Sequence, residues 1–135
     1  MRILMSIALV LWLAGFASAA GTGYSHTMTP EMRSQHNSMM VTQKQWAACK
    51  KSLEAGDFAA AGAALERIQK AASALEKFKL HKNADRVEEF REQSRTFREN
   101  LAELGRTVKE KDKARAKGIS RTIDNSCAQC HNVFR

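Results

Sequence analysis

Residues 87–104 read VEEFREQSRTFRENLAEL, and their apolar positions recur every three or four residues. That spacing places one apolar stripe along a helix and leaves the charged residues on the other face. Asn83 precedes the stripe as an expected N-cap, and Gly105 follows it as the expected end of the helix. We therefore predict a helix with one buried face. Its inward set is Val87, Phe90, Phe97, Leu101 and Leu104, with Ser94 as the one small polar member.

The segment that begins at Thr29 has the signals of an earlier helix. Thr29 suits the N-cap and Pro30 suits the first helical position, so this helix is expected to run toward Ala55 and Gly56. Its larger apolar residues are seven apart, which indicates one buried stripe. They are Met32, Met39, Trp46 and Leu53, and Cys49 lies on the same face.

Two further helices are predicted on either side of the quoted stretch. Asp57 is expected to cap the second helix of the chain, which extends to about Phe78 or Leu80. Thr107 and Glu110 have the spacing of a capping box, so the fourth helix is expected to begin there. Its apolar series continues in spite of one glycine and consists of Ile119, Ile123, Cys127, Cys130 and Phe134.

The connections between these helices are short, around Gly56, Lys82 and Gly105. A short connection makes each helix antiparallel to the one before it. The composition agrees, because one proline, seven glycines and few β-branched residues favour helix almost throughout. We predict an all-α fold, an antiparallel up-down-up-down four-helix bundle that forms a single domain over residues 29–135.

The N-terminus has the pattern of a secretory signal peptide. Arg2 is followed by an apolar run as far as Phe16, and small residues up to Ala19 provide a cleavage site. A retained membrane anchor is the other interpretation, but the run is shorter than the ~20 residues that span a bilayer. We predict a cleaved signal peptide over residues 1–19, a disordered leader over residues 20–28, and no stable membrane anchor after cleavage.

The chain is basic, with a formal net charge of +8 that becomes +7 when Arg2 leaves with the signal peptide. A basic surface attracts nucleic acid, anionic lipid or an acidic protein. An exported protein rarely meets nucleic acid, so we expect no nucleic-acid partner and favour an acidic protein. The run Arg106–Arg121, with seven basic and two acidic residues, could steer such a partner, and a solvated helix face is the alternative.

The chain has three cysteines, of which Cys127 and Cys130 form a C-x-x-C pair followed directly by His131. On a helix all three residues lie on one face, because they are three and four positions apart. Two thioether bonds can then hold a porphyrin edge while the imidazole reaches the iron. We therefore predict haem c, one per chain, covalently attached.

The sequence disfavours two other uses of the cysteines. A thioredoxin-like redox pair needs a βαβ context, which the sequence lacks, and a structural zinc site needs a fourth ligand close by. Cys49 is interpreted as a small core residue, with intermolecular pairing as the alternative. No glycine-rich phosphate loop or Ser/His/Asp arrangement occurs, so we expect no enzyme and no catalytic residue.

A helical bundle that ends in Cys127-x-x-Cys130-His131-x-x-Phe134-Arg135 resembles the class II cytochromes c, the cytochrome c′ group and its low-spin six-coordinate relatives. The resemblance covers the whole predicted bundle. It implies a periplasmic protein with haem among the helices, His131 as proximal iron ligand and Arg135 near that histidine. Phe134 fits the tyrosine or phenylalanine that the family usually has there. The connection between the second and third helices is shorter than in most members.

In this family the residue opposite the proximal histidine comes from the first helix. Met39 lies on the inward stripe, whereas Met40 is rotated by about 100°. We therefore predict Met39 as the second iron ligand, with flexible core packing as its alternative role and an open iron as the alternative state. His36 and His81 are minor ligand candidates.

The inferred function is electron transfer. A soluble periplasmic carrier would exchange electrons with redox partner proteins and would catalyse no reaction on a substrate of its own. The alternative is a five-coordinate haem module that binds nitric oxide or carbon monoxide at an open iron. Members of the family are often antiparallel dimers, although nothing in the apolar stripes of this chain requires a homodimer.

Overall fold

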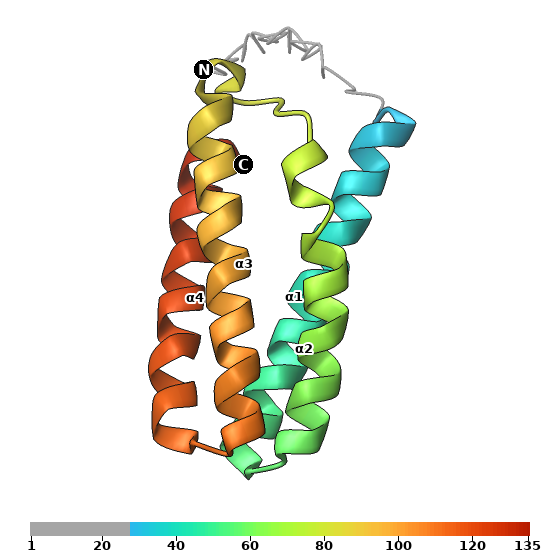
Figure 1. The fold of residues 1–135 in the computed structure, drawn as a ribbon. Helices are drawn as coiled ribbons and strands as arrows, with labels where there is room; N and C mark the ends of the chain where they lie inside the picture. Colours follow the sequence, from blue (N-terminus) through green and yellow to red (C-terminus); the bar gives the residue numbers. More distant parts are fainter. Residues whose placement is uncertain (1–27) are drawn as a thin grey trace, which may run out of the picture.

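The computed structural model describes residues 28–135, which form four long helices and no strand. The helices are α1 (Pro30–Ala55), α2 (Phe58–Ala72), α3 (Val87–Glu110) and α4 (Lys113–Phe134), with short 3₁₀ turns η1 (Leu75–Lys77) and η2 (Ala84–Arg86) between α2 and α3. They run alternately up and down, which confirms the predicted all-α antiparallel bundle (Figure 1). The predicted signal peptide and residues 20–27 of the predicted leader lie outside the described residues.

No helix within residues 28–135 is both long enough and apolar enough to cross a membrane.

The boundaries of α1 and the start of α2 agree with the capping signals. The Thr29 hydroxyl oxygen accepts a hydrogen bond from the Met32 amide at 3.1 Å, and Pro30 opens the helix. Gly56 ends α1 in the left-handed conformation, with φ 77°, which glycine adopts without steric cost. Asp57 caps α2 by accepting from the Ala60 amide at 2.9 Å.

The connection between α2 and α3 differs from the prediction. Helix α2 ends at Ala72, six residues before Phe78, and the Ser73 hydroxyl there donates to the Lys70 carbonyl at 2.8 Å. Such a local side-chain bond competes with continued helix. Asn83 does not cap α3, because it adopts the left-handed conformation with φ 53° and its side-chain amide donates to the Val133 carbonyl of α4.

The boundary between α3 and α4 was also predicted wrongly. Helix α3 continues through Gly105, which faces α2: an added Cβ would lie in ordinary contact, 3.5 Å from Leu65. Thr107 is fully buried within α3, and its hydroxyl donates to the Glu103 carbonyl rather than capping α4. The cap of α4 is Asp112, which accepts from the Arg115 amide at 3.0 Å.

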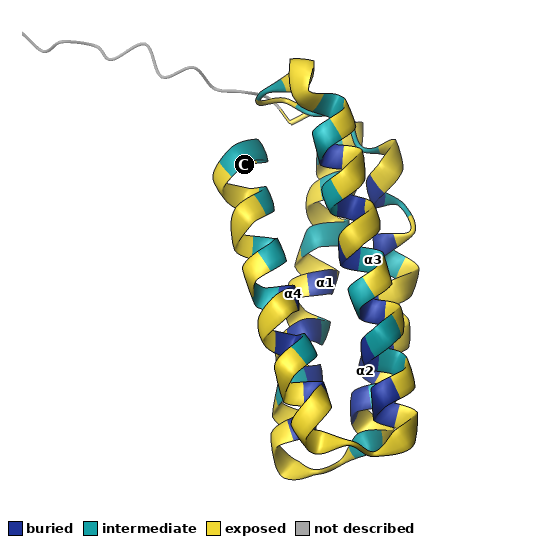
Figure 2. Ribbon diagram, turned by 60° about the vertical axis from the view of Figure 1, so that its left-hand side comes forward, coloured by how far each residue is buried: buried dark blue, intermediate teal, exposed yellow. Residues whose placement is uncertain are grey.

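The hydrophobic core is concentrated away from the C-terminal turns of α4. Helix α1 packs mainly on α2 and helix α3 mainly on α4, whereas α1 and α4 contact each other least among neighbouring helices. The buried residues of α4 are Ala116, Ser120 and Ile123, and none follows Ile123. Figure 2 shows this change along α4, whose last turns are teal and yellow. The largest fully buried side chains are Ile68, Leu101, Leu104, Ile123, Thr107 and Cys49.

Candidate haem site

The C-terminal half of α4 carries the C-x-x-C-H residues on one uninterrupted helix. Because α4 continues to Phe134, Cys127, Cys130 and His131 keep the helical spacing that brings them to one face. Both cysteines are partly buried, and Cys127 packs against the hydrophobic core. The two thiols therefore lie where the core of the bundle gives way to a more open region.

The thiols of this pair are unpaired and are kept in the neutral form by burial. Burial is the main cause that raises the pKa of Cys130 to about 11, and the neighbouring Cys127 is the second cause. Burial, followed by the charge of Asp124, also raises the pKa of Cys127. Reactive redox cysteines have lowered pKa values, so this environment disfavours the thioredoxin-like alternative.

A structural zinc site also lacks its ligands. Within the part of the chain that the structure describes, no group of three or more His, Cys, Asp or Glu side chains is arranged to hold a metal ion. A tetrahedral zinc site would need four such ligands.

His131 and Arg135 lie one helical turn apart at the end of α4, and both are exposed. The Arg135 amide donates to the His131 carbonyl at 3.2 Å. Although His131 as a whole is exposed, desolvation of the part that the protein covers is the main cause that lowers its pKa, and the Arg135 charge is the second. Both influences favour the neutral imidazole, which is the form that binds a metal. The role of Arg135 beside the haem and iron ligation by His131 both stay predictions.

The first helix directs Met39 inward and Met40 outward. Met39 is partly buried and packs against the core, whereas Met40 is 53% exposed. His36 on the same helix and His81 in the connection are both exposed. Met39 is therefore the one of these four side chains that lies against the bundle interior, and its role as an iron ligand stays a prediction.

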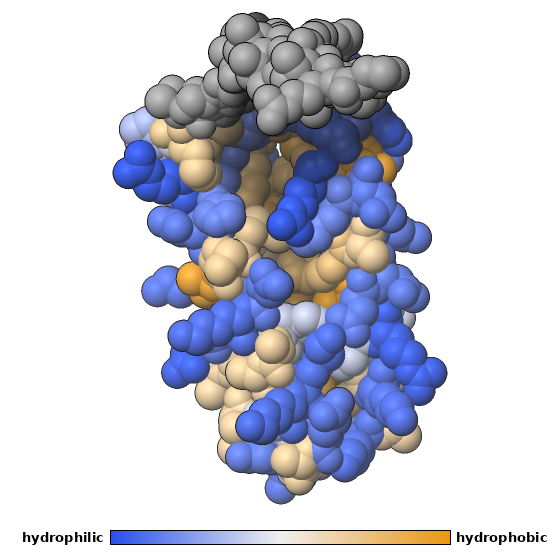
Figure 3. Space-filling view, turned by 180° about the vertical axis from the view of Figure 1, so that it is seen from behind, coloured by the Kyte–Doolittle hydropathy of each residue, from blue (hydrophilic) through white to orange (hydrophobic). Residues whose placement is uncertain are grey.

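Partly buried side chains of three different segments lie at the edge of the core on the Cys127 side. Met39 of α1, Phe78 of the connection and Cys127 of α4 are partly buried at the edge of the core. Figure 3 views the α1 and α4 side and shows a hollow with apolar residues inside and hydrophilic residues on its rim. An apolar hollow on the side of the helix that carries the two thiols is a suitable environment for a large apolar ring held by thioether bonds.

One polar cluster joins α1 to α4 next to the cysteines. The Trp46 indole nitrogen donates to a carboxylate oxygen of Asp124 at 2.7 Å, and the Lys50 ammonium donates to the same oxygen at 2.9 Å. The ammonium also lies 5.5 Å from the centre of the Trp46 ring. Burial alone raises the pKa of Asp124, but the hydrogen bonds from Trp46 and Lys50 and the Lys50 charge outweigh it and lower the pKa.

The apolar stripe predicts Trp46 as a core residue on account of its ring, but it does not indicate the Trp46–Asp124–Lys50 cluster. Asp124 directly follows the inward Ile123 and precedes Cys127 by three residues. An acidic residue so close to an inward position was the available signal, because a buried indole N–H usually finds a polar partner.

The connection between α2 and α3 holds the end of α4. The Lys82 ammonium donates to the Arg135 carbonyl at 2.9 Å, and the Asn83 amide donates to the Val133 carbonyl. The rings of Phe90 and Phe134 pack edge to face, with centroids 5.3 Å apart. These contacts bind the last turn of α4, which otherwise has unpaired carbonyls, and so they fix the helix that carries the motif.

The family model described as Cytochrome C' matches residues 79–135, which include all of α3 and α4 and the C-x-x-C-H residues. No curated protein and no solved structure was found to match the chain.

Proposed function

We propose that the chain, whose residues 79–135 match the Cytochrome C' family model, is a class II c-type cytochrome with covalently attached haem c and acts as a periplasmic electron carrier. Cys127 and Cys130 would hold its haem through thioether bonds, and His131 and Met39 would supply the protein ligands of the iron. It would catalyse no reaction on a substrate of its own.

The observation that carries the proposal is the inward position of Met39, which is partly buried and packs against the core. A methionine on the interior face of α1 can offer its thioether sulfur to an iron that His131 holds from α4. When bound, haem supplies an iron that exchanges one electron with a partner. A methionine ligand raises the reduction potential and occupies the position that a gas would need.

The other residues of the site would position and shield the group. Cys127 and Cys130 fix it to α4 whichever charge the iron carries. The Lys82 and Asn83 hydrogen bonds hold the last turn of α4 and, with it, the direction of His131. Arg135 contributes a positive charge beside that histidine, which favours the neutral imidazole. These roles need no movement of the helices, and a rigid site suits electron transfer.

The proposed location and partners rest on the sequence. The signal peptide pattern of residues 1–19 supports export to the periplasm. The positive net charge supports an acidic redox protein as partner, because complementary charge accelerates association.

The experiment that tests this proposal is the spectrum of the purified ferrous protein with and without carbon monoxide. A low-spin spectrum that carbon monoxide leaves unchanged is expected for the native protein. The Met39→Ala variant should become high-spin and bind carbon monoxide. Met40→Ala is the matched control on the exposed neighbour and should behave as the native protein.

The alternative function is gas binding at a five-coordinate iron. If the native protein is already high-spin and binds carbon monoxide rapidly, Met39 is a core residue and the gas-binding function replaces electron transfer.

A further inference from the structure

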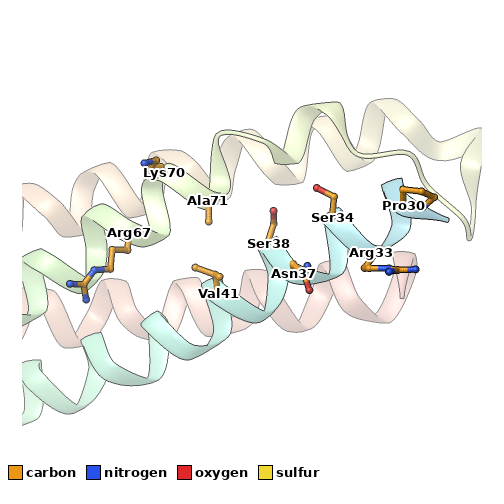
Figure 4. Close-up of a pocket in the computed structure, with 9 residues that line it drawn as sticks. All are labelled: Pro30, Arg33, Ser34, Asn37, Ser38, Val41, Arg67, Lys70 and Ala71. Carbon is orange, nitrogen blue, oxygen red and sulfur yellow. The ribbon is translucent and has the colours of Figure 1, made fainter. Parts of the chain in front are cut away.

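A groove runs along the outer side of α1 and α2 and belongs to neither the haem hollow nor the core. Its volume is about 670 Å³. Figure 4 shows Ala71 of α2 pointing toward Val41 and Ser38 of α1, with Arg33 and Arg67 at opposite ends. The lining residues, hereafter the α1–α2 groove, are Pro30, Arg33, Ser34, Asn37, Ser38, Val41, Arg67, Lys70 and Ala71.

The charge of the α1–α2 groove is entirely positive. Its lining includes Arg33, Arg67 and Lys70 and no acidic residue. Within residues 28–135 none of these three cations forms an ion pair, and Arg67 makes only a 3.4 Å hydrogen bond to Gln45. Most other arginines are paired with glutamates, namely Arg86, Arg91, Arg95, Arg98, Arg106 and Arg115. The groove therefore concentrates cations that the fold itself leaves without partners.

The same surface also exposes apolar side chains. Val41 in the groove is 46% exposed and the adjacent Met40 is 53% exposed. Only one other large hydrophobic residue within residues 28–135, Met28, is classed as exposed. Neighbouring exposed apolar residues inside a charged rim are typical of a protein interaction site.

We propose that the α1–α2 groove docks an acidic segment of the redox partner, one that carries apolar side chains among its carboxylates. This inference rests on the proposed electron-transfer function. The three cations would pair with carboxylates, and Val41 and Met40 would contact the apolar side chains. The hydroxyl and amide groups of Ser34, Asn37 and Ser38 can donate further hydrogen bonds to carboxylate oxygens.

Charge decides between this partner and a second copy of the chain. A symmetric dimer through the groove would bring Arg33, Arg67 and Lys70 of both copies together, and like charges oppose such contact. An acidic segment neutralises the same cations. The groove consequently favours a partner of opposite charge.

The position of the groove suits electron transfer. Residues 30–41 of α1 line it, and the same stretch presents the partly buried Met32 and Met39 on its other side. A partner in the groove would be separated from the haem hollow by one helix, whose diameter is about 10 Å.

The basic run Arg106–Arg121 is a weaker candidate for partner binding than its charge suggested. Arg106 pairs with Glu103, and Arg115 pairs with Glu103 and Glu110. The Lys113 ammonium donates to the Glu54 carbonyl at 2.7 Å. Several cations of the run are therefore already engaged within the bundle.

The test is binding of a synthetic peptide to the purified holoprotein, measured by fluorescence anisotropy at low and high salt. The probe is a labelled helical peptide with glutamate on one face and leucine on the other, and a lysine version serves as its control. The groove variant combines Arg33→Gln, Arg67→Gln and Lys70→Gln. The matched control combines Lys109→Gln, Lys117→Gln and Arg121→Gln, which removes the same charge from exposed cations of α3 and α4.

The native protein should bind the glutamate peptide, and salt should weaken the affinity. The affinity of the groove variant for the glutamate peptide should be about tenfold lower, because each of three exposed ion pairs changes affinity by roughly twofold. The affinity of the control variant should change little. Three results would each overturn the proposal. The first is an equal loss of affinity in the two variants, and the second is binding of anionic vesicles but not of the peptide. The third is a native dimer that the groove substitutions dissociate. The assay needs no redox reaction, so its failure is distinct from failure of the carbon monoxide test.

Discussion

The Trp46–Asp124–Lys50 cluster makes the connection between α1 and α4 open to a direct test. Substituting Asp124 by alanine removes the acceptor of the 2.7 Å hydrogen bond from Trp46 and the partner of Lys50. Trp46 is only 8% exposed, so its indole N–H would be left largely without a partner in the protein or in solvent.

The expected loss follows from the burial of each partner. An unpartnered buried donor costs about 1–3 kcal/mol. The Lys50 and Asp124 side chains are 39% and 45% exposed, so solvent screens their ion pair and it contributes under about 1 kcal/mol. Asp124→Ala should therefore lower the free energy of unfolding by about 2 kcal/mol. Lys50→Gln should cost well under half of that, and Asp124→Asn, which keeps an acceptor oxygen, should lie between.

Urea unfolding of the holoproteins, followed by far-ultraviolet circular dichroism, gives the three values. If Lys50→Gln lowers the free energy of unfolding as much as Asp124→Ala does, the ion pair and not the indole hydrogen bond is the larger contribution, and the expected order of the variants is wrong. The pH dependence gives a second check. The pKa of Asp124 is lowered in the folded state, so its contribution is complete above the unfolded pKa of about 3.9 and is lost as pH falls through the folded value. Asp124→Asn should lack this part of the acid sensitivity.

Three further predictions concern the helix boundaries and the proximal ligand. Gly118→Ala should raise the free energy of unfolding by about 0.5–1 kcal/mol, because alanine favours helix and nothing lies within 4 Å of the added Cβ. Gly56→Ala should lower it by about 1 kcal/mol, because φ is 77° at this position. Asp112→Ala should lower the free energy of unfolding by about 1 kcal/mol, because the cap of α4 is lost. Glu110→Ala removes only an exposed contact and should lower it by roughly 0.2 kcal/mol. Equal losses would contradict the observed boundary between α3 and α4. Urea unfolding measures both pairs. His131→Ala should keep haem on the polypeptide but change the ferric absorption spectrum, and an unchanged spectrum would remove His131 as a ligand.

Local sequence signals predicted the fold where they act within one helix. Thr29 and Asp57 cap the helices that they were expected to cap, because each satisfies an amide three residues ahead. Thr107 matched a capping pattern equally well, yet it is buried inside α3. The cap of α4 is instead Asp112, and local spacing alone does not distinguish a buried threonine inside a helix from a capping one.

The candidate site was predictable to the extent that it lies on one helix. The spacing of Cys127, Cys130 and His131 follows from the sequence, and the inward direction of Met39 follows from its stripe. The Trp46–Asp124 bond joins residues 78 positions apart, so the acidic residue beside Ile123 could indicate a polar contact but not the residue that it would meet. The α1–α2 groove was missed for the same reason, since unpaired cations can be recognised only when the acidic residues of the fold have been placed.

The central claim, that Cys127 and Cys130 hold the haem, is tested most directly by intact mass spectrometry of the denatured protein. The native polypeptide should carry the added mass of one haem after acid-acetone extraction, and the double variant Cys127→Ala, Cys130→Ala should carry none. Cys49→Ala, as the matched control, should retain the haem. A native polypeptide without the haem mass, or a double variant that keeps it, would contradict the claim.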